Sequence, residues 1–113
     1  MANLSLETSR AGRAAVIALS GELDLAGAAA LEQELARLER DAPEAVVLDL
    51  RGVEFMDSSG LRLIAVTNQQ AHDRGGRLVL VPGSEQVMRV FDITRMRERL
   101  DFVDDPADVT GGP

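Results

Sequence analysis

The fold is decided by one short stretch, V-E-F-M-D-S-S-G-L-R-L, at Val53–Leu63. An apolar strand runs into Asp57, two adjacent serines and a glycine, and a helical pattern of apolar residues follows. A turn of this kind places hydroxyl groups at the positive end of a helix, where backbone N–H groups and the helix dipole favour a phosphate group. The stretch therefore predicts a strand, a helix start and a candidate regulatory site in one place.

Asp57 is the best candidate for the N-cap of this helix. In that register Met56 and Leu61 take the two positions of a hydrophobic staple, which favours Asp57 over Ser58 as the cap. Because the aspartate then accepts the hydrogen bonds of the first backbone N–H groups, we predict that the Ser58 hydroxyl is exposed and free to attack a phosphoryl donor. Ser59 is the alternative acceptor. A purely structural turn is the competing interpretation, since Asp, Ser and Gly are ordinary residues at helix starts.

Arg62 follows Ser58 by four residues, about 40° around the same helix. It has three possible roles: pairing with a phosphorylated Ser58, contacting an acidic partner residue, or standing as a solvated arginine on an exposed face. Leu63 and Val66 fall on a different side of the helix. They are expected either to pack under the neighbouring helix around Val87 or to form a patch for a partner.

Outward from this stretch, strands and helices alternate after an initial hairpin. This order predicts an α/β fold, a single domain with a mixed four- or five-stranded sheet and about four helices packed mainly on one face. We expect residues 1–113 to form one domain, with its core at about 4–103 and a flexible C-terminal tail at 104–113. The expected elements are strands at Leu4–Leu6, Ala14–Ser20, Ala45–Leu50, Leu78–Val81 and Phe102–Val103, helices at about Ala26–Arg40 and from the Asp57 turn to Asp73, a helix capped by Ser84, a short helix capped by Thr94, and a last helical turn after Pro106.

Composition excludes several classes of function. The 113 residues include 12 basic and 19 acidic side chains, for a formal charge of −7, which disfavours binding to nucleic acid or to anionic membranes. There is no cysteine, so disulfides and thiolate chemistry are excluded. No apolar run is long enough to cross a bilayer. We expect a cytoplasmic protein without direct membrane insertion.

No catalytic or metal site is expected from the titratable residues. Asp49 interrupts an apolar strand and is expected to be a hydrogen-bonding acid rather than a general base. His72 is the single histidine, and with no cysteine beside it we expect no metal site and no cofactor. Glu22 and Asp24 end a predicted strand. They are expected either to rim a docking surface near Asp57 or to act only in loop and cap structure.

Five motifs together resemble a known family. They are G-E-L-D at Gly21–Asp24, V-L-D-L at Val47–Leu50, F-M-D-S-S-G-L at Phe55–Leu61, G-G-R-L-V-L at Gly75–Leu80 and V-F-D-I-T at Val90–Thr94. In this order and spacing they closely resemble the STAS domain (sulphate transporter and anti-sigma factor antagonist), and within it the stand-alone bacterial anti-anti-sigma factors. The resemblance spans about Leu4–Val103.

The resemblance implies a regulatory binding module rather than an enzyme. In such proteins the unphosphorylated form binds an anti-sigma factor that is also a serine kinase, which frees a sigma factor for transcription. The kinase phosphorylates the serine after the motif aspartate, here Ser58, and a Ser/Thr phosphatase reverses the modification. ATP and magnesium would be bound by the partner. The residues expected to contact it are Glu22, Asp24, Asp57, Ser59, Gly60, Arg62 and Leu63, and a monomer is favoured.

The same resemblance allows an alternative function. A STAS domain can also be the accessory subunit of a membrane transporter complex, in which the turn at Asp57 would be a docking element. The serine at position 58 favours the phosphorylation-controlled antagonist, because a subunit that is never phosphorylated does not need it. A hydrolytic or phosphotransfer enzyme is disfavoured, since no general base can be placed near Ser58.

Overall fold

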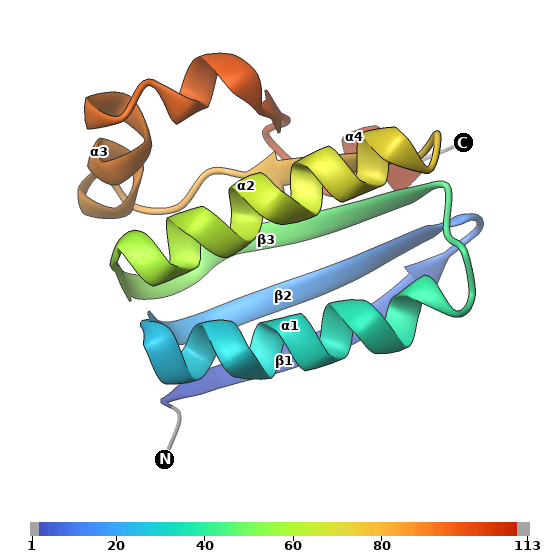
Figure 1. Ribbon diagram of the computed structural model, residues 1–113, viewed down its shortest axis with the longest axis horizontal. Helices are drawn as coiled ribbons and strands as arrows, with labels where there is room; N and C mark the ends of the chain where they lie inside the picture. The colour runs from blue at the N-terminus through green and yellow to red at the C-terminus, as the bar shows by residue number, and fades with distance from the viewer. Residues whose placement is uncertain (1–2, 111–113) are drawn as a thin grey trace.

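The strands form one five-stranded sheet, with helices on both of its faces (Figure 1). The computed structural model describes residues 3–110. The elements in chain order are β1 (Leu4–Ala11), β2 (Ala14–Leu23), α1 (Leu25–Glu39), β3 (Ala45–Met56), α2 (Ser58–Asp73), β4 (Arg77–Val81), α3 (Glu85–Ile93), the 3₁₀ helix η1 (Met96–Arg99), β5 (Asp101–Phe102) and α4 (Ala107–Thr110).

The sheet is mixed, and its strands follow the chain order β1-β2-β3-β4-β5. The β1–β2 hairpin is antiparallel and turns at Gly12, whose φ of 62° lies in the left-handed region that suits glycine. All other neighbouring strands are parallel, as helical crossovers require. β3 lies at the centre, and it joins the predicted strand at Ala45–Leu50 and the apolar residues before Asp57 into one continuous strand.

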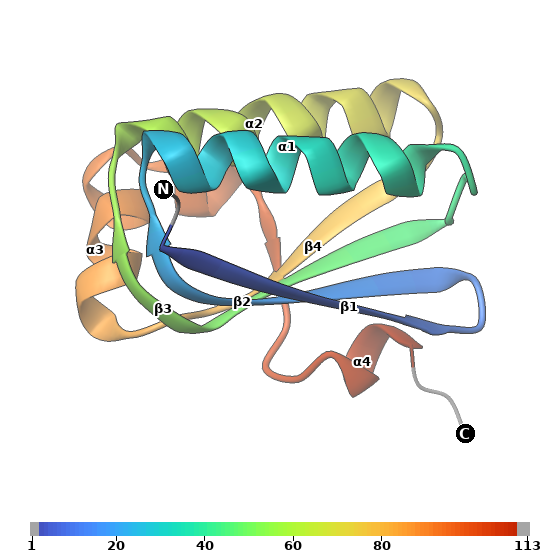
Figure 2. The same ribbon diagram turned by 90° about the horizontal axis from the view of Figure 1, so that it is seen from below.

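Helices α1 and α2 lie side by side on one face of the sheet, while α4 lies on the other (Figure 2). The larger core lies under α1, α2 and α3, where Leu31, Ile64 and Phe91 are fully buried. Burying a side chain of this size contributes about 1.5–3 kcal/mol. On the opposite face a small cluster of strand valines packs with Val109 of α4. The predicted α/β class and the mainly one-sided helix layer are therefore confirmed.

The predicted cap at Ser84 is confirmed and the one at Thr94 is wrong. The Ser84 hydroxyl accepts from the Val87 backbone N–H at 3.3 Å. Thr94 instead ends α3, because its hydroxyl donates back to the carbonyls of Val90 at 2.8 Å and Phe91 at 3.2 Å. η1 then follows a left-handed Arg95 without a side-chain cap. A threonine hydroxyl can bond backward to the helix before it, and here that bond is the one formed.

The C-terminal segment is more structured than the predicted tail. The helical turn expected after Pro106 is present as α4, and its half-buried Val109 packs on the sheet. This apolar contact ties residues 107–109 to the domain, while the end of the expected tail, 111–113, lies outside the described residues. Among residues 3–110, no helix combines the length and apolar character needed to span a membrane.

Candidate functional site

The first turns of α1 and α2 lie next to each other at one end of the sheet. β2 and β3 are parallel neighbours, with Leu23 opposite Met56 at their carboxyl ends. The Asp57 backbone N–H also donates to the Leu23 carbonyl at an N···O distance of 3.4 Å. Each strand runs directly into its helix, so Asp24 and Asp57 begin two helices at the same edge (Figure 2). The predicted proximity of the G-E-L-D segment to the Asp57 turn is thus confirmed.

Asp57 is the N-cap of α2, as predicted. Its Oδ1 accepts from the backbone N–H of Ser59 at 2.8 Å and from that of Gly60 at 3.4 Å. Its backbone is extended, as an N-cap requires. Met56 and Leu61, the two residues of the predicted staple, are both buried in the main core. The register in which Ser58 is the first helical residue is therefore the observed one.

The Ser58 hydroxyl is exposed and available. Because Asp57 caps α2, the Ser58 side chain does not, and within residues 3–110 it makes no hydrogen bond. Ser59 differs, since it is half-buried and its backbone N–H is held by Asp57. Of the two candidate acceptors, Ser58 is the better exposed.

Gly60 is buried and brings α2 close to the neighbouring strand. A Cβ at this position would lie 2.7 Å from Leu23 Cγ, 2.9 Å from the Leu23 carbonyl oxygen and 2.9 Å from Met56 Cγ. Real side chains do not approach so closely, so only glycine fits without displacement of its neighbours. Gly60 was expected to contact a partner, and its observed role is structural: it allows the close approach of α2 to the strand ends.

The two acids of the G-E-L-D segment are both engaged. Asp24 is the N-cap of α1, and its Oδ1 accepts from the Gly27 backbone N–H at 2.9 Å. Glu22 Oε1 accepts from Asn3 Nδ2 at 3.1 Å. Asp24 therefore has the capping role, which was one of its two expected roles. It also lies at the same edge of the sheet as Ser58.

Sequence reasoning missed that the start of α1 repeats the start of α2. Asp-Leu-Ala-Gly at 24–27 has the same cap-to-glycine spacing as Asp-Ser-Ser-Gly at 57–60. A Cβ on Gly27 would lie 2.5 Å from the Glu22 carbonyl oxygen, so this glycine also permits a close approach. Leu25 occupies the position that matches Ser58, and it is 73% exposed. The shared spacing was visible in the sequence and was the signal that could have found Leu25.

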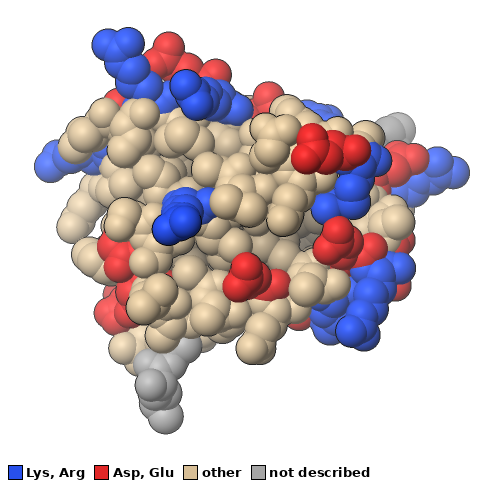
Figure 3. Space-filling model, viewed as in Figure 1, with Lys and Arg blue, Asp and Glu red and all other residues tan. Residues whose placement is uncertain are grey.

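These two helix starts form a surface with little charge. We define the helix-start surface as the exposed residues Leu25, Ala26, Ala29, Ser58 and Arg62. Neither helix has an acidic residue in its first turn, although such residues are common there. In the space-filling view this helical face is largely uncharged, and charged groups gather toward the end where α1 and α2 finish (Figure 3). Arg62 is the one charged member of the surface.

Leu63 and Val66 line a groove between α1 and α2. The groove holds about 480 Å³, and both residues line it together with Leu35 of α1. Leu63 is half-buried against the core, while Val66 is 46% exposed. Val87 of α3 is not among the residues that line the groove, but it belongs to the core cluster against which Leu63 packs. The partner-contact alternative for these two residues stays a prediction.

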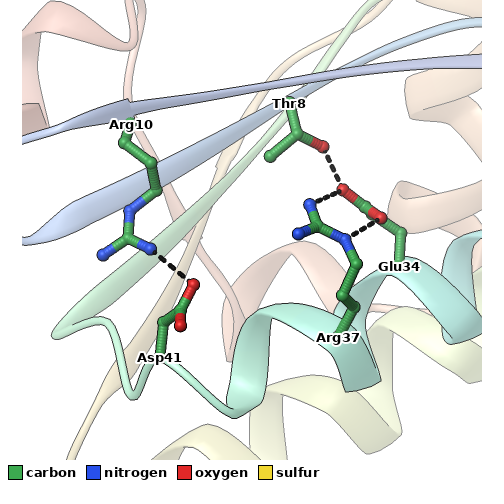
Figure 4. Close-up of polar contacts among 5 residues, drawn as sticks. All are labelled: Thr8, Arg10, Glu34, Arg37 and Asp41. Atoms are coloured by element: carbon green, nitrogen blue, oxygen red, sulfur yellow. Dashed lines mark hydrogen bonds and ion pairs between the residues drawn. The ribbon is translucent and has the colours of Figure 1, made fainter.

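The ion pairs in the second half of α1 and just after it lie away from the helix-start surface and connect α1 to the sheet. Glu34 accepts from Arg37 Nε at 2.9 Å and Nη2 at 2.6 Å, and from the Thr8 hydroxyl (Figure 4). The Arg37 hydrogen bonds, followed by the Thr8 bond, lower the pKa of Glu34 to about 2, against an opposing effect of burial. Arg10 and Asp41 pair at 3.0 Å nearby. These contacts tie α1 to β1.

Asp49 is a hydrogen-bonding acid, as predicted. It is buried and accepts from the Arg51 backbone N–H at 3.0 Å and from the Arg51 guanidinium at 2.8 and 2.9 Å. The Arg51 side chain lowers the pKa of Asp49, and burial opposes this effect. His72 is exposed near the end of α2. Within residues 3–110 no cluster of histidine and acidic residues could hold a metal ion.

Comparison with known proteins identifies a domain family and several relatives. The STAS domain profile matches residues 5–109. The anti-sigma-F factor antagonist RsfB of Mycobacterium tuberculosis is 45% identical over 56 residues, which are 50% of this chain and 46% of that protein. The match therefore spans about half the length of this relative. The anti-sigma-B factor antagonist of Staphylococcus aureus is 28% identical over 96 residues, 85% of this chain and 89% of that protein.

A solved structure has the same arrangement of elements. The anti-sigma factor antagonist from Mycobacterium paratuberculosis superposes with a TM-score of 0.83 at 28% identity, covering 93% of this chain and 89% of that one. The family resemblance found in the five sequence motifs is thereby confirmed, together with the predicted fold class.

Proposed function

The chain belongs to the STAS domain family, and we propose that it acts as an anti-sigma factor antagonist controlled by phosphorylation of Ser58. In this proposal the unphosphorylated protein binds an anti-sigma factor that is also a serine kinase. Phosphorylation of Ser58 dissociates this complex and so regulates sigma-factor-dependent transcription. The names of the relatives support the class of partner.

The proposal depends on one observation: Asp57 caps α2, while the side chain of the neighbouring Ser58 is exposed and takes no part in the cap. Asp57 accepts the hydrogen bonds of the helix start at 2.8 and 3.4 Å, so the neighbouring hydroxyl is not needed for the fold. Ser58 is exposed at the edge of the helix-start surface. A serine in this position can be modified without loss of the cap.

The transfer step needs only the partner's nucleotide. The partner would bind ATP with Mg²⁺ and place the γ-phosphoryl group against Ser58 Oγ. A bond forms between Oγ and the γ-phosphorus, and the bond from that phosphorus to the bridging oxygen breaks. The hydroxyl proton passes to a basic group of the partner or to water, and ADP leaves. A Ser/Thr phosphatase would return the hydroxyl by hydrolysis.

The phosphate works as a switch because of where its charge falls. Phosphorylation adds about 1.5 to 2 negative charges to one exposed hydroxyl. The first turn of a helix tolerates this charge, since free N–H groups and the helix dipole favour anions. A docked surface does not tolerate it when the facing group is acidic or loses its water. A change of about 5.5 kcal/mol in relative affinity would convert 99:1 occupancy into 1:99.

Several of the other expected contact residues lie in or beside the first turns of α1 and α2. Asp57 and Ser59 flank Ser58 in the sequence, Asp24 begins the adjacent helix, and Leu63 lines the groove between α1 and α2. In our proposal these residues form the rim of the docking surface. Contiguous exposed apolar surface is typical of a protein contact.

The proposal is tested by incubation with candidate kinase-type anti-sigma factors and ATP, followed by intact mass measurement and site mapping. We expect one phosphate, located on Ser58, and its loss in Ser58→Ala. Ser59→Ala is the matched control, because it removes the neighbouring hydroxyl and leaves the Asp57 cap in place. Phosphate on Ser59 in the native chain, or tight binding of Ser58→Asp to the same partner, would contradict the proposal.

A further inference from the structure

Arg62 is one of six arginines that form no ion pair within residues 3–110. All 12 basic residues are arginines, and six of them form ion pairs within the described part of the chain. Arg62 is not among those six, and it is exposed. It also lies on the helix-start surface, whose other four members carry no charge. A guanidinium in this setting is available to an incoming anion.

The helix geometry directs Arg62 toward Ser58. Residues four apart on an α-helix are surface neighbours, with Cβ atoms about 5–6 Å apart. Every Cα–Cβ bond also tilts toward the helix N-terminus, so a side chain covers the turn before its own. Arg62 therefore lies over the turn that contains Ser58. The order is also the favourable one, with the anion on the N-terminal side of the cation.

The nearest acids are already committed to other contacts. Asp57 holds two backbone N–H groups of α2, and Asp24 holds the Gly27 N–H of α1. The other charged groups on the elements around the start of α2 are, in chain order, Glu22 of β2, Glu32, Glu34, Arg37 and Glu39 of α1, Asp49, Arg51 and Glu54 of β3, and Glu85, Arg89 and Asp92 of α3. Of the groups on α2 itself, Arg62 is the cation closest in sequence to Ser58.

We propose that Arg62 is the phosphate-binding residue of the phosphorylated form and that it contacts an acidic side chain of the partner when Ser58 is unmodified. This inference rests on the proposed function for the existence of the phosphate. The guanidinium presents a planar fork of N–H donors that suits both a carboxylate and a phosphate. The two anions compete for one group.

This competition reverses the charge of the surface. With a free hydroxyl, Ser58 and Arg62 together carry one positive charge. With a phosphate of about 1.5 to 2 negative charges, the pair carries between about −0.5 and −1. A partner carboxylate that faces Arg62 is attracted in the first state. In the second it loses its donor and meets a negative group.

The test installs phosphoserine at position 58 during translation, so that no kinase is required. The second pKa of the phosphate, near 6 when unperturbed, is followed by ³¹P NMR in the native chain and in Arg62→Gln. Because a nearby cation favours the dianion, we expect Arg62→Gln to raise this pKa by about 0.3, from a pair energy of about 0.2–0.5 kcal/mol. Salt should shrink the difference between the two proteins.

Arg40→Gln is the matched control. Arg40 is exposed and follows α1 at the end opposite Leu25. The substitution therefore removes one positive charge far from the phosphate. We expect it to leave the phosphate pKa unchanged within about 0.1. Equal pKa values in Arg62→Gln and the native chain, or equal shifts in the two variants, would overturn the inference. Unfolding midpoints of both variants show whether the fold is retained.

A second arm examines the partner contact. With a kinase-type anti-sigma factor as the probe, Arg62→Gln should weaken binding of the unphosphorylated protein several-fold at low salt, and Arg40→Gln should not. No binding by the native chain would count against the proposed function and leave the phosphate titration valid. Native binding that is unchanged in Arg62→Gln would overturn the acidic-contact half of the inference alone.

Discussion

The starts of α1 and α2 have one architecture and two different first residues. Each begins with an aspartate cap, and each has a buried glycine three residues later that lets the helix approach the sheet. They differ at the exposed position between, where α1 has Leu25 and α2 has Ser58. The cap and the glycine are therefore scaffold in both helices, and in our proposal the function lies in the exposed residue that they present.

The largest effects should come from the two glycines. Gly27→Ala and Gly60→Ala would each place a Cβ within 3.0 Å of neighbouring atoms. We expect each to lower the free energy of unfolding by roughly 1–3 kcal/mol, since overpacking outweighs the better helix propensity of alanine. Urea unfolding measures this. Ser59→Ala is the control in the same turn. An unchanged midpoint for either glycine variant would show that the two helix starts are not held in the same way.

The two caps should contribute almost equally. Asp24→Ala and Asp57→Ala each remove a carboxylate that accepts from the first helical turn. The expected loss is about 1 kcal/mol each, while the Asn variants should keep most of the stability because Asn is a comparable cap. Thermal and urea unfolding of the four variants provide the comparison. An Asn variant as unstable as its Ala counterpart would mean that charge, not capping, is what matters there.

The hydrogen bonds of Glu34, which connect α1 to β1, should stabilise the protein in a pH-dependent way. The pKa of Glu34 is lowered to about 2 in the folded protein, below its ordinary value of 4.5. Its contribution is therefore present above pH 4.5 and is lost as the pH falls toward 2. We expect Glu34→Gln to cost about 0.5–1 kcal/mol near pH 6 and almost nothing near pH 2. A cost that is the same at both pH values would contradict this assignment.

The smallest effect on stability should come from exchanging the two exposed residues. The double variant Leu25→Ser with Ser58→Leu keeps both caps and both glycines. Because both positions are exposed, we expect the free energy of unfolding to stay within about 0.5 kcal/mol of the native value. Chemical denaturation checks this expectation. A loss above about 1 kcal/mol would show that one of these side chains has a packing role, which would weaken the comparison.

Local sequence signals predicted most of the elements and the register of the α2 cap. Alternation, apolar periodicity and cap residues act over a few residues, so Asp57 and Ser84 could be assigned without a structure. Thr94 could not, because its hydroxyl had two local choices and the backward bond to Val90 formed. The motifs that resemble the STAS family supplied the phosphorylation hypothesis, which the cap geometry alone left open.

Features that depend on contacts between distant residues were out of reach. The close approach at Gly60 involves Leu23 of another strand, and no periodicity in α2 reveals it. The position of Leu63 on a groove toward α1 depends on how the helices sit on the sheet. The pairing of Glu34 with Thr8 across 26 residues is of the same kind. Each is a consequence of tertiary packing.

In our proposal a phosphate on Ser58 changes docking and leaves the fold intact. This proposal is tested most directly by isothermal titration of a kinase-type anti-sigma factor with the native protein and with the phosphoserine-58 protein, both matched in unfolding midpoint. We predict at least about a 100-fold weaker affinity for the phosphorylated protein, equal to about 2.7 kcal/mol. Equal affinities of the two forms for a partner that binds the native protein would contradict the account.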